Sequence, residues 1–317
     1  MASIFRALAV MSWGCRSGNE ARVYRIDPPV SCCSGYTWLF TEHSREAVLI
    51  SQPKHIIAIA SGKGGVGKST VTMNLAIALK SMGFSVGVLD ADVYGPSQQH
   101  MLGVADSVTP EQKDGKYLLP VETQGIKAMS MGFLAGAKTP MVWRGPMASG
   151  ALMQMLDQTL WGDLDLLLVD MPPGTGDIQL TLAQKAALSG AVIVTTPQDI
   201  ALLDAQKGVE MFAKVGVPIL GVVQNMAVHI CQACGHEEHI FGADGAQRLA
   251  KDYGVTVLAD LPLSGALRAA SDNGESILVA APESPEAQAV RAAAAALINK
   301  LNTLSAPSSP TISMSDD

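Results

Sequence analysis

Short, unbroken apolar runs alternate along most of the chain with segments of helical spacing. The first run, His55 to Ala60, precedes a segment from Ser69 to Met82 in which Val71 and Leu75 recur one turn apart. Because the runs are continuous rather than alternating, we expect both faces of each strand to be covered. Further strands are predicted at Val86 to Leu89, Leu166 to Val169, Ala191 to Thr195, Ile219 to Val223 and Val255 to Leu258. Further helices are predicted at Pro146 to Leu160, Ile178 to Ala187, Ile200 to Val215, Ala243 to Tyr253 and Pro285 to Leu301.

The alternation of strand and helix predicts an α/β fold with a doubly wound, mostly parallel sheet and helices on both faces. We expect one main domain over residues 54–302. Residues 1–53 have no clear periodicity and are treated as a leader outside the fold. Residues 303–317 are rich in serine and proline and end in acids, which predicts a disordered tail.

The amino-acid composition and net charge limit the classes of protein to which the chain can belong. With 48% hydrophobic and 16% charged residues among 317, the chain can bury a large core. Its net charge of −7 and the lack of any run of lysine or arginine argue against a nucleic-acid partner. Since no run reaches 18 uninterrupted apolar residues, we expect no integral membrane segment.

The first 25 residues hold four arginines, Arg6, Arg16, Arg22 and Arg25, against one acid, Glu20. This is the composition of a mitochondrial presequence, and it predicts the mitochondrial matrix. An unstructured extension without targeting value is the alternative, with the cytoplasm as the compartment.

The five cysteines, Cys15, Cys32, Cys33, Cys231 and Cys234, are an odd number and lie far apart. They do not suit the disulfide framework of a small secreted protein. A reducing compartment follows, and it leaves Cys231 and Cys234 free to be metal ligands.

A phosphate-binding loop is predicted between the first strand and the first helix. Gly62 to Ser69 reads GKGGVGKS and fits G-x-x-x-x-G-K-[ST], in which successive backbone N–H groups point at phosphate oxygens. Lys68 would reach the outer phosphates of ATP, and the Ser69 hydroxyl would bind Mg²⁺. A glycine-rich turn without a ligand is the alternative. The residues expected to bind nucleotide are Gly62, Lys63, Gly64, Gly65, Val66, Gly67, Lys68, Ser69 and Thr70.

Lys63 is a second cation inside this loop, whereas an ordinary phosphate loop needs only the lysine beside the serine. Its position resembles the deviant loop of the MinD, ParA and nitrogenase iron protein class, in which this lysine reaches across a dimer to the partner's nucleotide. The resemblance implies a homodimer with Lys63 in the catalytic site. A solvated loop lysine is the alternative.

Three acids at strand ends are expected to serve phosphoryl transfer. Asp90 and Asp92 follow one apolar strand, at the edge where open α/β sheets bind ligands. We assign Asp92 to orienting the attacking water and Asp90 to support near Mg²⁺, with two acids that cap a strand as the alternative. Asp170 ends a later apolar strand, which suits an aspartate that holds Mg²⁺ through its water shell.

Two further features complete the predicted nucleotide site. Met171 to Asp177 holds two prolines and two glycines, which suits a switch loop that senses ATP versus ADP. Asn225 follows the strand that begins at Ile219, where its amide can pair with a purine, so we assign it to adenine. A turn-forming asparagine is the alternative.

Cys231 and Cys234 form a C-x-x-C followed by glycine, a spacing that lets two thiolates bind one metal centre. His236 or His239 would complete a structural zinc site within one chain. Alternatively, two chains would supply the four thiolates that a [4Fe–4S] cluster needs. The spacing leaves both open, beside a redox-active or inert thiol pair.

Five segments together resemble the Mrp family of iron–sulfur carrier ATPases. They are SGKGGVGKST at 61–70, DADVYGPS at 90–97, VDMPPGTGD at 169–177, TPQDIALLDA at 196–205 and CQACG at 231–235. The resemblance spans roughly residues 54–300 and implies a P-loop fold of the MinD and nitrogenase iron protein type. It also implies a homodimeric ATPase that binds a labile [4Fe–4S] cluster between two C-x-x-C pairs. ATP turnover would gate passage of that cluster to apo-proteins.

One departure from the family concerns the N-terminus. Many bacterial members carry a small α/β domain ahead of the phosphate loop, and the 53 residues here are too few and too irregular for it. The chain thus resembles the mitochondrial branch that serves respiratory complex I, whose subunits are candidate recipients. A MinD- or ParA-like positioning ATPase with a structural zinc site is the rival, but it would need a basic face or tail.

Overall fold

The computed structural model describes residues 51–135, 145–231 and 233–305, so most of the predicted leader and tail lies outside the described residues, as do Cys15, Cys32 and Cys33. The strands are β1 His55–Ala60, β2 Val86–Asp90, β3 Gln112–Lys113, β4 Tyr117–Leu118, β5 Val121–Thr123, β6 Ile126–Ser130, β7 Leu166–Asp170, β8 Gly190–Thr195, β9 Ile219–Gln224, β10 His229–Ile230, β11 Glu237–Glu238 and β12 Val257–Asp260. The helices are α1 Lys68–Ser81, α2 Gln98–Met101, α3 Met131–Ala135, α4 Gly145–Gln158, α5 Asp177–Lys185, α6 Asp199–Lys214, α7 Gly245–Tyr253, α8 Gly265–Asp272, α9 Ile277–Ala280 and α10 Pro285–Ser305.

Eight strands form one sheet in the order β12-β9-β8-β1-β7-β2-β6-β5. Neighbouring strands run parallel except β5 and β6, which pair antiparallel at one edge. All residues of β2, β7 and β8 are buried, as continuous apolar runs predict for strands covered on both faces. The predicted mostly parallel sheet is confirmed.

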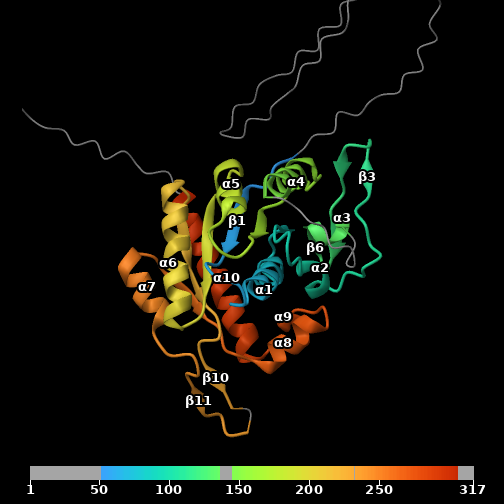
Figure 1. Ribbon diagram of the computed structural model, residues 1–317. Coiled ribbons are helices and arrows are strands. Elements are labelled where there is room, and N and C mark those ends of the chain that lie inside the picture. The colour runs from blue at the N-terminus through green and yellow to red at the C-terminus, as the bar shows by residue number, and fades with distance from the viewer. Residues whose placement is uncertain (1–50, 136–144, 232, 306–317) are drawn as a thin grey trace, which may run out of the picture. The chain divides into compact units, whose positions relative to one another are not determined.

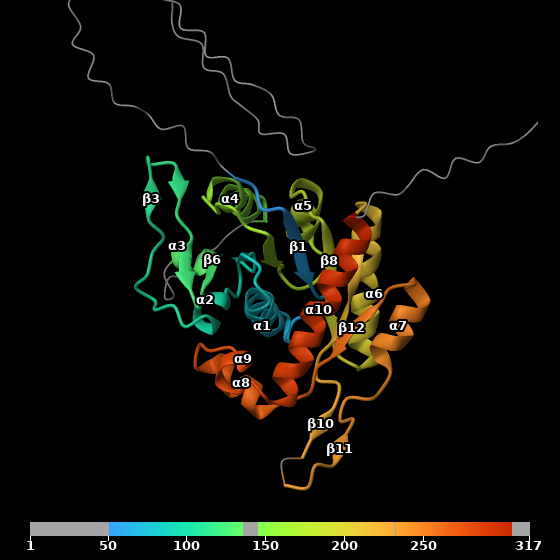
Figure 2. The ribbon, with the colours of Figure 1, turned by 180° about the vertical axis from the view of Figure 1, so that it is seen from behind.

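Helices cover both faces of this sheet. One hydrophobic core joins the sheet to α1, α8, α9 and α10, and the other joins it to α4, α5, α6 and α7. Figures 1 and 2 show these two layers of helices from opposite sides. The chain passes from β1 to β2 on one side of β1 and later returns to β8 on its other side. Such a reversal opens a crevice at the carboxyl ends of the strands, where ligands bind.

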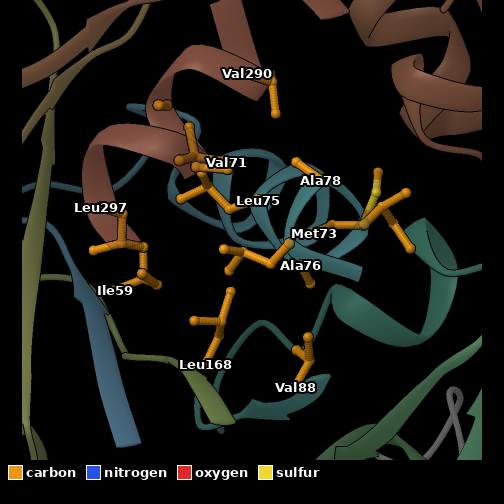
Figure 3. Packing of buried hydrophobic residues seen from close by; sticks show 14 of the residues in the cluster. Ile59, Val71, Met73, Leu75, Ala76, Ala78, Val88, Leu168, Val290 and Leu297 are labelled. Atoms are coloured by element: carbon orange, nitrogen blue, oxygen red, sulfur yellow. The ribbon is translucent and has the colours of Figure 1, made fainter. Parts of the chain in front are cut away.

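Helix α1 is buried between the sheet and α10. Ten of its 14 residues are buried, and apolar side chains lie on all its sides, as expected of a helix inside a core. Figure 3 shows Val88 and Leu168 from the strands on one side of α1, and Val290 and Leu297 from α10 on the other. Packing therefore fixes the N-terminus of α1, which follows the predicted phosphate loop.

Several predicted element bounds differ from the structure by a few residues, among them those of β12 and α10. β12 begins two residues later than predicted, because Val255 closes the turn after α7 with an N–H bond to Ala250 O at 3.0 Å. α10 continues past the predicted end at Leu301 to Ser305, three residues into the predicted tail.

The apolar pattern of the sequence does not predict strand β6. Lys127 interrupts its apolar pattern, but the lysine amine donates to Trp161 O at 2.7 Å, so the charge is accommodated beside the sheet. Among the described residues, no helix combines the length and the apolar character that crossing a bilayer needs.

Candidate functional site

The loop from Gly62 to Gly67 joins the carboxyl end of β1 to the start of α1. Gly65 and Gly67 adopt left-handed backbone, with φ of 82° and 83°, which glycine accepts without steric cost. A Cβ atom at Gly67 would also come within 2.2 Å of the side-chain amide nitrogen of Asn225. The loop borders a pocket of about 190 Å³. The pocket is lined by Ser61, Gly64, Gly65, Gly67, Lys68, Ser69, Thr70, Asp92, Ser97, Met101 and Pro173.

Within the phosphate loop, Gly62, Lys63 and Val66 are the predicted nucleotide-binding residues that do not line this pocket, and Asn225 does not line it either. Val66 is buried in the core. A Cβ atom at Gly62 would lie 2.0 Å from the carbonyl oxygen of Asp204, so α6 packs directly on the loop backbone. Lys63 is exposed, and its backbone carbonyl accepts a hydrogen bond from Ser61 Oγ at 3.0 Å. The Lys63 side chain is therefore accessible to groups outside its own pocket.

A buried ion pair lies beside the pocket. The Lys68 amine contacts Asp170 Oδ1, and the two side chains are 6% and 0% exposed. Thr72 Oγ1 donates to the same oxygen at 3.3 Å, and Gln98 Nε2 donates to Asp170 Oδ2 at 2.8 Å. Ser69 Oγ lies 3.4 Å from Lys68 Nζ. The fold thus brings together the predicted phosphate lysine, the predicted magnesium serine and the strand-end aspartate.

Asp90 is fully buried, and its carboxylate organises the loop that follows β2. Oδ1 accepts the N–H of Asp92 at 3.1 Å. Oδ2 accepts the N–H groups of Ser97 and Gln98 at 3.0 and 3.1 Å, and a hydroxyl from the last residue of β6 at 3.0 Å. Burial, and then the negative charge of Asp170, raise the pKa of Asp90 to about 7. Asp90 therefore holds this loop in place, and its predicted support of Mg²⁺ stays a prediction.

Asp92 lines the phosphate pocket from the loop after β2. Its Oδ1 accepts the N–H of Gly95 at 3.3 Å. Asp92 also lines a second pocket of about 310 Å³, which it shares with Tyr94 and the start of α5. Partial burial raises the pKa of Asp92. Asp92 therefore lines both pockets.

Asn225 follows β9 and is 5% exposed. Its Nδ2 donates to Val66 O at 2.9 Å, so the side chain contacts the phosphate loop directly. Its backbone N–H donates to Thr195 O at 2.8 Å. These contacts explain why the residue is buried, and its assignment to adenine stays a prediction.

The C-x-x-C lies on a hairpin formed by β10 and β11, which pair antiparallel apart from the main sheet (Figures 1 and 2). The N–H of Cys231 donates to His236 O at 2.9 Å, and the N–H of Gly235 donates to Cys231 O at 2.8 Å. Cys231 is half-buried, Cys234 is exposed, and both thiols are free. The hairpin follows β9 at the carboxyl edge of the sheet, the edge that also carries the phosphate loop.

The hairpin favours the thiolate form of Cys231. The backbone N–H groups of Ala233 and Cys234 hydrogen-bond to the Cys231 sulfur and lower its pKa, and the Cys234 thiol adds a third hydrogen bond. The thiolate is the form that binds metal. The turn is therefore suited to hold a soft metal centre.

The histidines of the zinc alternative, His236 and His239, are both exposed. His239 Nδ1 lies 2.9 Å from Ala227 O, so one ring nitrogen is already engaged. In the ranges that the structure describes, no group of three or more His, Cys, Asp or Glu side chains is arranged to hold a metal ion. A third ligand beside Cys231 and Cys234 is therefore not assembled within the described part of one chain.

The sequence motifs do not single out two residues that contact Asp170. Thr72 lies one helical turn after Lys68, a spacing that could have identified it. Gln98 follows the DADVYGPS segment, and nothing in its local pattern indicates that its amide reaches Asp170. Only the fold brings this side chain to the site.

The site combines a glycine loop after a central parallel strand, a buried helix behind that loop, and a lysine paired with a strand-end aspartate. This combination defines a P-loop nucleoside triphosphatase. The family model described as "ParA: NUBPL iron-transfer P-loop NTPase" matches residues 52–298. The chain belongs to this family of iron-transfer P-loop NTPases. Membership implies ATPase activity, and the predicted resemblance to a family of iron–sulfur carrier ATPases is confirmed.

Individual relatives agree with this assignment. The iron-sulfur cluster carrier protein of Pseudomonas fragi is 61% identical over 236 residues, which cover 74% of this chain and 82% of that protein. The iron-sulfur cluster transfer protein NUBPL of Mus musculus is 50% identical over 252 residues, or 79% of this chain and 78% of that protein. A solved nucleotide-binding protein from Archaeoglobus fulgidus, in complex with ADP, is 40% identical with a TM-score of 0.62. That similarity covers 70% of this chain and 86% of the solved chain.

The match leaves part of some relatives uncovered. Against other bacterial iron-sulfur cluster carrier proteins that are 56 or 57% identical, the chain spans only 63 or 64% of their length.

Proposed function

We propose that the protein is an ATP-dependent iron–sulfur cluster carrier, which binds a labile [4Fe–4S] cluster across a homodimer and transfers it to apo-proteins. The observation that carries this proposal is the hairpin with two free thiols, Cys231 and Cys234, at the sheet edge that also bears the phosphate loop. Relatives named as cluster carrier or cluster transfer proteins support it.

The pocket residues fit ATP and Mg²⁺ by their chemistry. Left-handed glycines in the loop suit backbone N–H groups that face phosphate oxygens. Lys68 supplies a buried cation, and Ser69 and Asp170 supply the oxygen ligands that Mg²⁺ prefers. When bound, Mg²⁺ neutralises charge on the phosphates. Asp90 would support this site through the loop that it holds.

Asp92 and Asn225 are assigned to the two ends of the nucleotide. Asp92 lies between the phosphate pocket and an adjoining hollow, so its carboxylate would orient a water for attack on the terminal phosphate. Asn225, beside the loop backbone, would pair with adenine.

Lys63 would act in the partner subunit's site. It is the loop cation that does not line its own pocket, and its side chain is exposed. A homodimer that brings two phosphate loops face to face would place this charge against the other chain's phosphates, where it would stabilise the charge of phosphoryl transfer.

The cluster is the cargo. Each chain supplies two thiols, and a [4Fe–4S] cluster prefers four thiolates, so two hairpins related by a two-fold axis would share one cluster. Because the hairpin is exposed, a cluster held there would lie near the surface, which suits release to an acceptor.

Recipients and compartment follow from the family resemblance and the leader. Apo iron–sulfur proteins are the proposed recipients, with subunits of respiratory complex I as candidates. The Arg-rich first 25 residues support the mitochondrial matrix, with the cytoplasm as the alternative. The proposal involves no nucleic acid.

A transfer assay tests this function. The protein is reconstituted anaerobically with iron and sulfide, then mixed with an apo-enzyme whose activity needs a [4Fe–4S] cluster, in the presence of an iron chelator. The wild type should restore acceptor activity, and Mg-ATP should change the rate of transfer. The double variant Cys231→Ser with Cys234→Ser should hold no cluster and restore nothing.

The double variant His236→Ala with His239→Ala is the matched control, and it should transfer like the wild type. Suppose instead that this variant loses bound metal and that the wild type holds about one Zn²⁺ per chain with S₂N₂ ligation. The carrier proposal would then fail, and a zinc-stabilised switch ATPase would replace it.

A further inference from the structure

Gln98 occupies an unusual position for an uncharged polar residue. It is the first residue of α2, directly after the loop that carries Asp92, and its side chain is only 1% exposed. Its backbone N–H donates to Asp90 Oδ2 at 3.1 Å. The residue therefore connects the loop after β2 to the interior of the nucleotide site.

The side-chain amide of Gln98 bridges two of the residues assigned to Mg²⁺, Ser69 and Asp170. Its Nε2 donates to the backbone carbonyl of Ser69 at 2.9 Å and to Asp170 Oδ2 at 2.8 Å. An amide nitrogen has two hydrogens, so both are used. The orientation of the amide is fixed, because a flipped amide would turn its oxygen toward two acceptors.

The oxygen of this amide has no hydrogen-bond partner among the described residues. Gln98 Oε1 is buried and accepts no hydrogen bond from any residue that the structure describes. An unpaired buried acceptor lowers stability, and an apolar side chain of similar volume would avoid that loss but would also remove the donor to Ser69 O and Asp170 Oδ2. The amide is thus explained by the two acceptors that its nitrogen holds.

The two oxygens of Asp170 have different surroundings. Oδ1 faces Lys68 and Thr72, whereas Oδ2 is bonded to Gln98. If Lys68 turns toward bound phosphates, as the proposed function requires, Asp170 loses its cation. Gln98 would then keep Oδ2 in place while Oδ1 becomes free to face the metal's water shell.

We propose that Gln98 is a positioning residue for the magnesium end of the nucleotide site, acting through Asp170 and the Ser69 backbone. The inference rests on the proposed Mg-ATP site and adds to it a residue outside the phosphate-loop motif. Outer partners of metal ligands act in this way, because they fix the orientation of the ligand that touches the metal or its water.

The test compares Gln98→Met with Gln99→Met. Methionine keeps the length of the side chain and removes the amide. Gln99 is the matched control, since it is also buried and adjacent in sequence, but its Nε2 donates to Ala105 O at 3.2 Å. Binding of a fluorescent, non-hydrolysable ATP analogue is titrated with Mg²⁺, and a parallel titration is run in EDTA.

We expect Gln98→Met to raise the Mg²⁺ concentration at half-saturation by about 10-fold, as loss of an outer partner of a metal ligand does. Affinity for the analogue in EDTA should stay within about twofold. Gln99→Met should leave both quantities unchanged. The melting temperature of Gln98→Met should fall only slightly, because removal of the unpaired Oε1 partly offsets the loss of the donor to Ser69 O and Asp170 Oδ2.

Three results would overturn either the role of Gln98 or the nucleotide site on which it rests, and they can be told apart. If the wild type binds the analogue with Mg²⁺ dependence and Gln98→Met has the same Mg²⁺ midpoint, the role of Gln98 is wrong while the site stands. If the melting temperature falls and the Mg²⁺ midpoint does not move, the amide is merely structural, which also overturns the inference. If the wild type shows no Mg²⁺-dependent binding, the proposed nucleotide site itself fails.

Discussion

At the residue scale, the site is shaped by two carboxylates that share one buried region. Asp90 and Asp170 end neighbouring strands, lie opposite each other in register, and are both fully buried. Two close carboxylates resist ionising together. Lys68 neutralises Asp170, whereas Asp90 accepts hydrogen bonds from N–H and hydroxyl groups. Burial, and then the charge of Asp170, raise the pKa of Asp90.

The raised pKa of Asp90 predicts the sign of a pH effect. A carboxyl with a pKa of about 7 in the fold and 3.8 as its ordinary value holds its proton in the folded state between these values. Its contribution to stability is therefore present below pH 3.8 and is lost as pH rises toward 7. Urea unfolding across this range should show a steeper fall in the free energy of unfolding for the wild type than for Asp90→Asn. Parallel curves would contradict the assignment.

Asp92→Asn should separate binding from hydrolysis. The amide keeps the shape of the side chain but orients water poorly, so turnover of ATP should fall by roughly 100-fold. Affinity for a non-hydrolysable analogue, measured by calorimetry, should stay close to that of the wild type. Unchanged turnover would move the water-orienting role to another residue.

At the scale of elements, the position of the phosphate loop depends on α1 being held between the sheet and α10. Leu297 of α10 is fully buried in this contact, while Leu304 on the same helix is 48% exposed. Leu297→Ala should lower the free energy of unfolding by about 2–5 kcal/mol through lost burial and the cavity left behind. Leu304→Ala should change it by less than about 0.5 kcal/mol. Equal effects in denaturant titrations would contradict this packing.

The helices and strands also show which parts of the fold can be predicted from the sequence. Strands such as β7 and β8 carry unbroken apolar runs, so the sheet and its crevice follow from local pattern. The pattern fails at β6, where Lys127 interrupts the run and finds a partner only in the folded chain. It also fails at Gln98, whose bond to Asp170 joins residues 72 positions apart. Local spacing identifies motif residues, but not the side chains that the fold brings to them.

At the scale of the whole molecule, the proposed homodimer makes each nucleotide site depend on both chains. Lys63→Ala and Lys68→Ala are each expected to abolish ATPase activity, because one removes the cation given to the partner and the other the cation of the chain's own loop. Mixing the two variants should partly restore activity, since each heterodimer regains one composite site. A mixture no more active than either parent would show that Lys63 works within its own chain or not at all.

Under the proposed function, two chains share one cluster through Cys231 and Cys234. Native mass spectrometry of the anaerobically reconstituted protein tests it most directly, because it weighs the chains and the bound cluster together. We expect a species of two chains with one [4Fe–4S] cluster, absent when Cys231 and Cys234 are replaced by serine. A single chain that carries one zinc ion, with no cluster-bound dimer, would contradict it.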